Sequence, residues 1–473
     1  MTDSFHSSAL FPPLGERIAA ENRLTDVLWS AHGRLGAASV MPVLDLPAFR
    51  EALAGFDFQT PKRLDDVLDW TVSQLEHGIV QITHPRYFGL FNPNPAFPAQ
   101  CADRIAAVFN PQLATSKTSP AAVEMEAHVV RALAGRAGLP ADASGHFTSG
   151  GTEANFTALV CALTRASSRF AAEGARAFSG PPAFYVSRES HLAWIKIAHE
   201  TGIGRDAVRL GATDGSGRMD VAALEAAIRA DRAKGAEPVM VVATAGTTGA
   251  GMIDPLAECA GAAREHGLWY HIDAAWGGAL IVSDRLRQVL AGIELADSIT
   301  IDAHKWLAAT MGCGIFLTRH ASVLTAAFDV STSYMPSHIE SVDPYVTSAQ
   351  WSRRFMGLRL FLSLAAAGWE GYAEHIERSI ALARYAKEAL EGRGWTIVNS
   401  SPLAVLGMIP PKKDLKVAPI VERMLAWGRA WVSLASYEGR QVVRACVVNG
   451  ETTRADVDEL VLALEDAFRA EAG

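Results

Sequence analysis

The chain has 473 residues, with 43 Lys and Arg against 51 Asp and Glu, a net charge of −8 and a hydrophobic fraction of 49%. This composition is typical of a large globular protein. The lack of a long basic run argues against nucleic acid as the main partner. No apolar run reaches the roughly 18 residues that a membrane-spanning helix needs, so no membrane partner is expected.

The five cysteines are odd in number, widely spaced and without a CxxC pair: Cys101, Cys161, Cys259, Cys313 and Cys446. This pattern predicts free thiols in a reducing compartment, with neither a disulfide framework nor a zinc module or other metal site. The first 22 residues contain an early Asp3 and no apolar core, which is unlike a secretory signal. Together these features predict a cytoplasmic protein, and its length favours an enzyme.

The first 84 residues predict an N-terminal arm. Residues 14–35 have a helical pattern, and Pro42 and Pro47 interrupt the chain that follows. A second, amphipathic helix is indicated by apolar residues at helical spacing: Leu64, Val67, Leu68, Val72 and Leu75.

From about residue 145 short apolar strands alternate with helices. Asp220 is expected to cap a helix that Gly235 ends, and Asp254-Pro255 to open another that Gly267 ends. This alternation predicts an α/β fold whose mostly parallel sheet is covered on both faces and binds ligands beyond the carboxyl ends of its strands. The expected strands are 183–186, 239–244, 268–272, 298–302 and 314–318.

The periodicity fades between Thr325 and Trp351, and a stretch of this kind is usually functional or mobile. Beyond it strands and helices no longer alternate strictly, which predicts a smaller α+β C-terminal domain. We expect an arm over 1–84, a large domain over 85–360 with a mobile loop at about 326–351, and a small domain over 361–473. The elements expected in the small domain are a helix over 369–390, strands over 396–398, 403–408 and 442–448, and a last helix from about Thr453.

The segment HFTSGGTEAN (146–155) lies between an expected strand and an expected helix. Gly150 and Gly151 let the backbone approach a ligand, and Thr152 adds a hydroxyl. The free N–H groups and positive dipole end of the following helix favour an anion such as phosphate. The segment has neither the lysine of a Walker A loop nor the spacing of GxGxxG. A tight turn with an ordinary cap explains these residues equally well.

Two charged residues follow neighbouring strands. Asp273 is a carboxylate at the end of an apolar strand, which is costly unless a positive group meets it, although it could instead cap the next helix. Lys305 follows the next strand, where partial burial would make its amine a nucleophile. A lysine that extends to solvent is the simpler alternative.

A phosphate site, a carboxylate and a lysine at one sheet edge together match the needs of pyridoxal 5'-phosphate (PLP). The phosphate anchors the cofactor, the lysine binds it covalently, and the carboxylate keeps the pyridine nitrogen protonated. A NAD or ATP site would leave Lys305 and Asp273 unexplained. We therefore expect PLP as the cofactor.

The chain resembles the group II PLP-dependent decarboxylases, which include aromatic-amino-acid, histidine, glutamate and cysteine-sulfinate decarboxylases. The resemblance implies fold type I, the aspartate-aminotransferase-like fold, and a homodimer with active sites at the interface and the arm packed on the partner subunit. The similar stretches run in family order: HPRYFGLFNPNPAFP (84–98), HFTSGGTEANFTAL (146–159), ATAGTTGAGMIDPL (243–256), YHIDAAWGG (270–278), ADSITIDAHKWL (296–307) and NGETTRADVDELV (449–461).

The resemblance also implies roles for single residues. Lys305 matches the lysine that binds the cofactor, and Asp273 the partner of the pyridine nitrogen. His191 matches the histidine stacked on the cofactor ring, which can also orient the substrate carboxylate or relay a proton. The other cofactor-binding matches are Gly150, Gly151 and Thr152 in the phosphate loop, Ala275 under the ring, Thr248 near the 3-hydroxyl and His304 beside the phosphate.

Tyr334 falls where the family has a mobile loop with a catalytic tyrosine, which protonates the substrate carbon after CO2 leaves. Relatives that make aldehydes typically have phenylalanine there, so Tyr334 favours plain decarboxylation of an L-amino acid to its amine and CO2. The alternatives are an oxidative, aldehyde-forming reaction on the same cofactor, and a non-catalytic cofactor-binding protein. The joint presence of Lys305, Asp273, His191 and Tyr334 argues against the latter.

The candidate substrate-binding residues are Leu90, Phe91 and Asn92. Leu90 matches neither the aromatic residue of aromatic-specific relatives nor the glutamine of glutamate-type relatives. Phe91 favours an aromatic or bulky substrate, and Arg86 leaves an acidic one as the alternative. Asp302 stands where asparagine is common in the family. A carboxylate beside a phosphate would be unfavourable, so either it points away or the phosphate surroundings differ.

Overall fold

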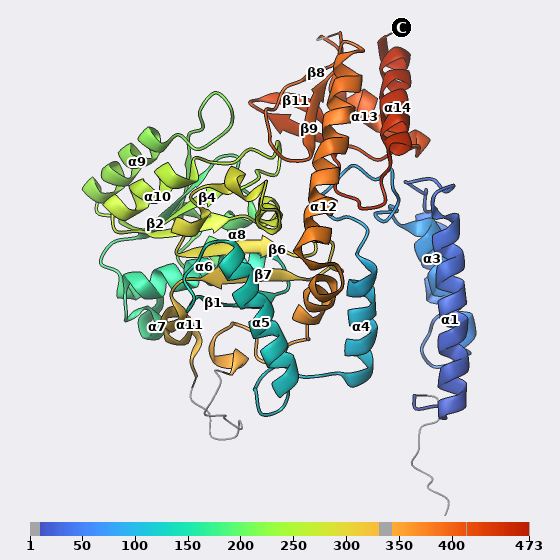
Figure 1. Cartoon of the computed structure of the whole chain (residues 1–473), viewed down its shortest axis with the longest axis horizontal. Helices are drawn as coiled ribbons and strands as arrows, with labels where there is room; N and C mark the ends of the chain where they lie inside the picture. Colours follow the sequence, from blue (N-terminus) through green and yellow to red (C-terminus); the bar gives the residue numbers. More distant parts are fainter. Residues whose placement is uncertain (1–9, 331–342, 413, 473) are drawn as a thin grey trace, which may run out of the picture.

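The computed structural model describes residues 10–330, 343–412 and 414–472 (Figure 1). Its centre is a seven-stranded sheet in the order β1-β7-β6-β5-β4-β2-β3. Strands β2 to β6 run parallel, as expected, whereas β7 pairs antiparallel with both β6 and β1. The strands are β1 Ser144–Thr148, β2 Pro182–Ser187, β3 Val208–Gly211, β4 Glu237–Thr244, β5 Trp269–Asp273, β6 Ser298–Asp302 and β7 Gly314–Thr318.

Helices connect the strands and pack on the sheet. The helix capped by Asp220, whose carboxylate accepts from Ala223 N, follows the sequence-based expectation. Asp254 differs, because its carboxylate accepts from Met219 N and Thr244 N while Pro255 precedes the helix. The helices are α4 Phe97–Phe109, α5 Pro120–Arg136, α6 Gly151–Ala166, α7 Phe170–Glu173, α8 Ala193–Glu200, α9 Val221–Ala233, α10 Leu256–Glu265 and α11 Ala321–Phe328.

The central strand β4 is apolar from Val239 to Ala243 because both faces of the sheet are buried. On β4, Met240 and Val242 pack in the cluster that contains α6 and α8. Val241 and Ala243 pack in the larger cluster that contains α9 and α10. Since successive side chains of a strand point to opposite faces, a sheet covered on both sides shows no polar alternation.

The N-terminal helices lie at one side of the molecule, next to α4 (Figure 1). They are α1 Leu14–Leu35, α2 Leu46–Ala54 and α3 Leu64–Gly78, and none has a fully buried residue. Their contacts with α4 include the ion pair Arg104–Glu21 at 2.8 Å and the rings of Trp29 and Phe97, 5.9 Å apart. The two helices expected here are therefore present, and their apolar faces remain largely exposed.

The C-terminal residues form a four-stranded antiparallel sheet in the order β10-β11-β9-β8, with helices beside it. The expected helix over 369–390 is part of a longer one that begins at Gly357 and is interrupted at Gly368, where φ is 65°. The sequence pattern missed α13 and β10. The elements are α12 Gly357–Glu391, β8 Thr396–Ile397, β9 Val405–Ile409, α13 Val417–Trp427, β10 Ser433–Tyr437, β11 Arg440–Cys446 and α14 Arg454–Ala472.

The expected loop over 326–351 is partly helical at its start, because α11 continues to Phe328. A short turn follows at Pro344–Val346, and residues 331–342, with Tyr334 among them, lie outside the described residues. None of the described helices is both long and apolar enough to cross a membrane. The domain boundaries at 84 and 360 stay predictions, and α12 runs across the second of them.

Candidate active site

A cavity of about 270 Å³ lies at the carboxyl ends of β4, β5 and β6, where ligands of parallel sheets bind. Ten of the thirteen candidate site residues line it. Leu90 and Asn92 are absent from its lining, and Tyr334 lies outside the described residues. The ten residues are Phe91, Gly150, Gly151, Thr152, His191, Thr248, Asp273, Ala275, His304 and Lys305.

The glycine loop joins β1 to the N-terminus of α6. The N–H groups of Glu153 and Ala154 bond to Gly150 O, whereas those of Gly151 and Thr152 have no acceptor within the described chain. A Cβ on Gly151 would lie 2.8 Å from Asp302 Oδ2, so no larger residue fits there without a shift. Free N–H groups at the start of a sixteen-residue helix make this end of the cavity suited to an anion.

Asp273 ends β5, is 5% exposed and is held on both oxygens. Its Oδ2 accepts from Asn155 Nδ2 at 2.9 Å, and its Oδ1 accepts from Ala275 N at 3.1 Å. Asp273 does not cap the next helix, the alternative interpretation, because that helix begins at Gly277 after Trp276 and has no side-chain cap; Asp273 instead lines the cavity. The two bonds fix the carboxylate in one orientation.

Behind Asp273 a chain of buried hydrogen bonds runs along one face of the sheet. His271 Nε2 lies 3.0 Å from Asn155 Oδ1, and His271 Nδ1 lies 2.8 Å from Ser298 Oγ. Burial lowers the pKa of His271 to about 4, so the ring is neutral near pH 7. Because Asn155 donates its amide to Asp273, its oxygen must accept, which makes Nε2 the protonated nitrogen of His271. Ser298 then donates to Nδ1 and accepts from Trp269 Nε1 at 2.8 Å.

Lys305 lies in the turn after β6, with its side chain 21% exposed and Nζ 3.0 Å from Asp302 Oδ2. Asp302 is 3% exposed and lines the cavity, so its carboxylate does not point away from the site. His304 packs against the glycine loop, and its Nδ1 lies 3.0 Å from Cys313 O. The lysine ammonium is therefore the partner that balances the buried carboxylate.

The remaining candidates lie on the wall of the cavity or outside it. His191 is exposed, and its Nδ1 accepts from Ala193 N at 3.1 Å. Leu90 is 45% exposed, and Asn92 Nδ2 lies 3.0 Å from Met311 Sδ. The guanidinium of Arg86 lies 3.3 Å from Gly36 O and 3.9 Å from Glu459, which gives it partners away from the cavity.

Arg444 is a residue that the sequence reasoning missed. It is 3% exposed, and its guanidinium lies over the ring of Phe91, 4.4 Å from the centroid. Nη1 donates to Gly89 O at 2.7 Å, whereas the buried Nε and Nη2 have no partner in the described part of the chain. The sequence held no local signal for it, because β11 meets the segment around Gly89 only in the folded chain.

The sheet, with a lysine, a carboxylate and a helix N-terminus around one cavity at its carboxyl edge, defines a PLP-dependent enzyme of fold type I. A family model described as the pyridoxal-dependent decarboxylase conserved domain matches residues 52–402. The chain belongs to this family. It is thus a carboxy-lyase that uses PLP to decarboxylate an amino acid, as the resemblance implied.

Within the family, this chain is similar in sequence to three curated relatives of different substrate classes. The L-2,4-diaminobutyrate decarboxylase of Rhizobium meliloti (strain 1021) is 35% identical over 69% of this chain, and the match spans only 65% of that relative's length. The cysteine sulfinic acid decarboxylase of Homo sapiens is 32% identical over 82% of each chain. The acidic amino acid decarboxylase of Bos taurus is 30% identical over 81% of this chain and 77% of its own.

Solved structures show the same fold. The crystal structure of mouse CSAD has a TM-score of 0.88 at 28% identity and covers 95% of this chain and 99% of its own. Oryza sativa TDC with PLP and tryptamine has a TM-score of 0.91 at 23% identity and covers 97% of this chain and 99% of its own. At 23% sequence identity, the similarity to Oryza sativa TDC shows a shared fold and nothing more.

The residues of the cavity fit the cofactor. The free N–H groups of Gly151 and Thr152 suit its phosphate, and the absence of a Cβ at Gly151 keeps that end open. Asp273 presents a fixed carboxylate, and Lys305 presents an amine in the same cavity. These donors and acceptors are the set that PLP needs.

Proposed function

We propose that this enzyme decarboxylates a short acidic L-amino acid, of the kind of aspartate, glutamate or cysteine sulfinate, to its amine and CO2. Lys305 would hold the cofactor covalently, and Asp273 would keep a proton on its ring nitrogen. Gly150, Gly151 and Thr152 would bind its phosphate. When bound, PLP supplies an electron sink for the reaction.

The side chains of this chain would perform the remaining steps. Thr248, Ala275, His304 and His191 would position the cofactor and the substrate carboxylate, since all four line the cavity. The bond between Cα and the carboxylate breaks, CO2 leaves, and a proton must reach Cα. We assign that proton to the hydroxyl of Tyr334, in the segment expected to close over the site and exclude water.

Arg444 is the observation that supports an acidic substrate. A buried guanidinium with two unpartnered nitrogens is costly unless an anion can meet it. The ring of Phe91, which is 7% exposed and lines the cavity, lies over this guanidinium. A modest turn of Phe91 would let the side-chain carboxylate or sulfinate of a substrate reach Arg444. The curated relatives whose names mention acidic and sulfinic amino acids agree with this class.

An aromatic or bulky substrate is the second candidate, supported by the stack of rings at the cavity wall. The ring centroids of Phe91 and Trp276 are 4.2 Å apart, and those of Trp276 and Trp306 are 5.1 Å apart. These rings already stack on one another, whereas Nε and Nη2 of Arg444 have no partner among the described residues. The acidic substrate is therefore the first choice.

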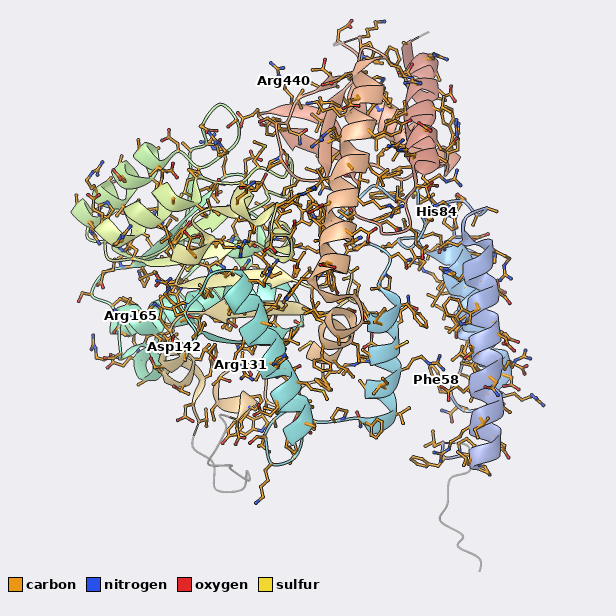
Figure 2. All side chains as sticks on the ribbon, viewed as in Figure 1. Phe58, His84, Arg131, Asp142, Arg165 and Arg440 are labelled. Atoms are coloured by element: carbon orange, nitrogen blue, oxygen red, sulfur yellow. The ribbon has the colours of Figure 1, made fainter. Side chains whose placement is uncertain are left out.

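The test is product analysis of the PLP-loaded protein with single amino acids: L-cysteine sulfinate, L-aspartate, L-glutamate, L-2,4-diaminobutyrate, L-tyrosine and L-tryptophan. We expect amine and equimolar CO2 from an acidic member. Arg444→Gln should raise the KM for that substrate at least ten-fold, whereas Arg440→Gln, an exposed arginine on the same strand (Figure 2), should leave it unchanged. Turnover of only the aromatic or diamino substrates would refute the proposal.

We further propose a homodimer in which the N-terminal arm packs on the partner subunit. The arm helices carry large apolar side chains that the rest of this chain leaves exposed to solvent. Among them are Leu14, Ile18 and Trp29, which are 72%, 51% and 50% exposed. Exposed apolar area of this extent typically marks an interface. Light scattering should give twice the chain mass of 50.5 kDa. Replacing Leu14 and Ile18 by serine should shift the protein towards the monomer, and a monomer for the unaltered chain would refute the dimer.

We also propose that this enzyme is located in the cytoplasm, which is a reducing environment. All five cysteines are free thiols, and four of them are buried. Unpaired thiols of this kind are usual where glutathione and thioredoxin keep cysteines reduced. Fractionation of the source cells should recover the activity with cytoplasmic marker enzymes.

A further inference from the structure

A second cavity, of about 410 Å³, lies at the opposite end of the strands that carry the active site. On β5, Trp269 at the start lines this second cavity, whereas Asp273 at the end lines the first. On α6, Thr152 lines the first cavity and Arg165 the second. Five residues of a strand span about 16 Å, so the two cavities are separated by the length of the strand.

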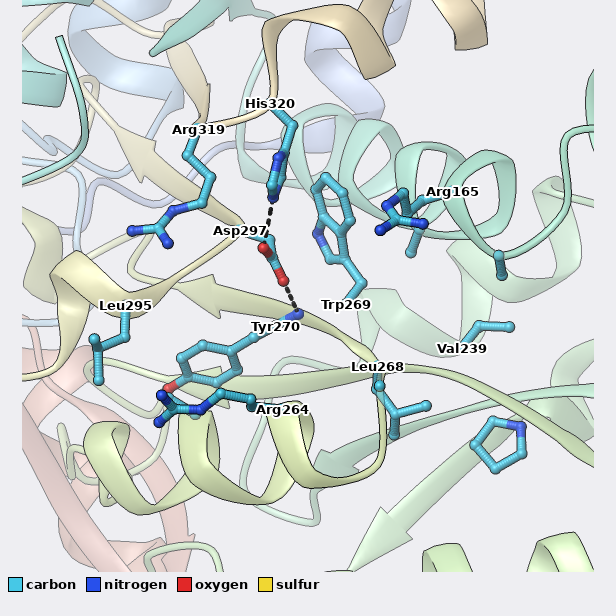
Figure 3. A pocket seen from close by; sticks show the side chains of 15 residues that line it. Arg165, Val239, Arg264, Leu268, Trp269, Tyr270, Leu295, Asp297, Arg319 and His320 are labelled. Atoms are coloured by element: carbon cyan, nitrogen blue, oxygen red, sulfur yellow. Dashed lines mark hydrogen bonds and ion pairs between the residues drawn. The ribbon is translucent and has the colours of Figure 1, made fainter. Parts of the chain in front are cut away.

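The rim of the second cavity is basic. Arg165 lies in the last turn of α6, Arg264 in the last turn of α10, and Arg319 and His320 follow β7 (Figure 3). Three different elements thus bring cationic side chains to one opening. Figure 3 shows Arg319 and Arg264 on one side of the cavity and Arg165 on the other.

The only acidic side chain among the lining residues is already engaged. Asp297 Oδ2 accepts from Tyr270 N at 2.7 Å, and its Oδ1 lies 2.7 Å from His320 Nε2. Both oxygens are therefore directed at groups other than the arginines. The carboxylate fixes His320 and the start of β5 but does not neutralise the rim.

The three arginines have no acidic partner among the described residues. No carboxylate oxygen of a described residue lies within 4.0 Å of a guanidinium nitrogen of Arg165, Arg264 or Arg319. Arg319 donates through Nη2 to Glu294 O at 2.6 Å, and its buried Nε has no acceptor in the described ranges. Three arginines around one cavity, none of them paired with a carboxylate of the described residues, favour the binding of an anion from outside.

The floor of the cavity is apolar. The buried lining residues Ala162, Val239, Leu268 and Trp269 form this floor, and Pro238 also lines the cavity. The volume is within the range of small-molecule sites and much larger than an inorganic anion needs. A basic rim over an apolar floor suits a molecule with an anionic group and a flat apolar body.

We propose that this cavity is a binding site for a small organic phosphate of nucleotide size, separate from the PLP site. The phosphate would be held by Arg264 and Arg319, since guanidinium groups bind phosphate oxygens in pairs. The flat body would lie on the apolar floor towards Arg165. The site is independent of the substrate proposed above, because none of its lining residues lines the first cavity.

The test is calorimetric titration of the PLP-loaded protein with AMP, ATP and inorganic phosphate, so that the cofactor site is already filled. We expect saturable binding of AMP or ATP at one site per chain, at least ten-fold tighter than that of inorganic phosphate. Arg264→Gln, on an exposed helix end, should weaken nucleotide binding at least ten-fold without affecting folding. Arg319→Gln should do the same.

The matched control is Arg131→Gln, an exposed arginine of α5 away from the cavity (Figure 2). This variant should bind the nucleotide as the unaltered protein does, and all three variants should keep their decarboxylase activity. Nucleotide binding that is absent at millimolar concentration, or that survives both cavity substitutions, would overturn the proposal. Equal affinity for inorganic phosphate and for both nucleotides would show that only the phosphate group is recognised, which would overturn the proposal of an organic ligand.

Discussion

Asp302 Oδ2 lies 3.0 Å from Lys305 Nζ, so the amine assigned to the cofactor already has a carboxylate partner in this chain. Asp302 is nearly fully buried and also faces the glycine loop, where a Cβ on Gly151 would touch it. If Lys305 holds the cofactor as proposed, its amine would no longer be the free ammonium that balances this charge. The carboxylate would then lie beside an anionic phosphate without a partner.

We therefore predict that Asp302→Asn binds PLP more tightly than the unaltered protein. Loss of one negative charge near a partly solvated anion is worth about 1 kcal/mol, or roughly a five-fold lower Kd. Titration of the apoprotein with PLP, followed by absorbance, measures it. Asp142→Asn, an exposed acidic residue remote from the cavity, is the control (Figure 2). Weaker binding by the Asp302→Asn variant would mean that the carboxylate assists attachment instead.

Asn155 is the link between Asp273 and His271, and its removal gives the second prediction. In Asn155→Ala both Asp273 Oδ2 and His271 Nε2 lose a buried partner. An unmet buried polar group costs about 1–3 kcal/mol, so kcat should fall roughly ten- to hundred-fold while PLP still binds. Steady-state kinetics and the cofactor absorbance of the purified protein measure the two effects.

The control for Asn155 is Thr157→Ala on the same helix. Thr157 is also buried, but its hydroxyl donates to Glu153 O and touches neither Asp273 nor His271. An equal loss of kcat in both variants would point to disturbed packing of α6. A loss confined to Asn155→Ala would assign the effect to the orientation of Asp273.

Strand ends predicted that Lys305, Asp273 and the glycine loop would lie at one edge of the sheet, and all three line one cavity. Lys305, Asp273 and the glycine loop follow separate strands, and parallel strands bring their carboxyl ends to one edge whatever lies between them. Arg444 had no comparable signal. It reaches Phe91 only because Phe88 pairs with both Trp431 and Cys446, contacts that join segments more than 300 positions apart.

Packing also decided several local features that the sequence pattern left open. The sequence pattern places Asp254 at the start of a helix, but its carboxylate is 2% exposed and accepts hydrogen bonds from backbone N–H groups. Burial there raises the pKa of Asp254 to about 6. The antiparallel β7 follows β6 through a turn rather than a helix, so no parallel crossover is possible there. The kink at Gly368 needs a positive φ, which a helical periodicity does not reveal.

Tyr334 gives a prediction on the product rather than on the rate alone. If its hydroxyl supplies the proton at Cα, Tyr334→Phe should lose most of its amine formation while it binds PLP as before. A reaction left without that proton becomes open to oxidation by dissolved O2, which is reduced to H2O2, so aldehyde and ammonia should rise relative to amine. Mass spectrometry of amine, aldehyde and CO2 from one substrate measures this. Unchanged amine output would refute the role, and Tyr345→Phe, outside the cavity lining, is the matched control.

His146 gives a prediction on the pH dependence of stability. It is 4% exposed on β1, and neither ring nitrogen has a hydrogen-bond partner in the described structure. Burial, with a smaller contribution from Arg353, lowers its pKa from 6.5 to about 3. As the pH falls below 6.5 the unfolded chain takes up a proton that the folded chain does not. The free energy of unfolding should therefore decrease by about 1.4 kcal/mol for each pH unit between 6.5 and 3 from this residue alone.

His146→Leu removes both the proton uptake and the unpartnered nitrogens. Its stability relative to the unaltered protein should rise steadily as the pH is lowered from 7 to 5, since the unfolded variant gains no proton at this position. Urea unfolding at pH 7.0, 6.0 and 5.0 measures the difference. His128→Gln, an exposed histidine of the neighbouring helix α5, should show no such trend. A difference that stays constant with pH would mean that the ring is protonated in the folded chain, and that burial at this position does not exclude the charge.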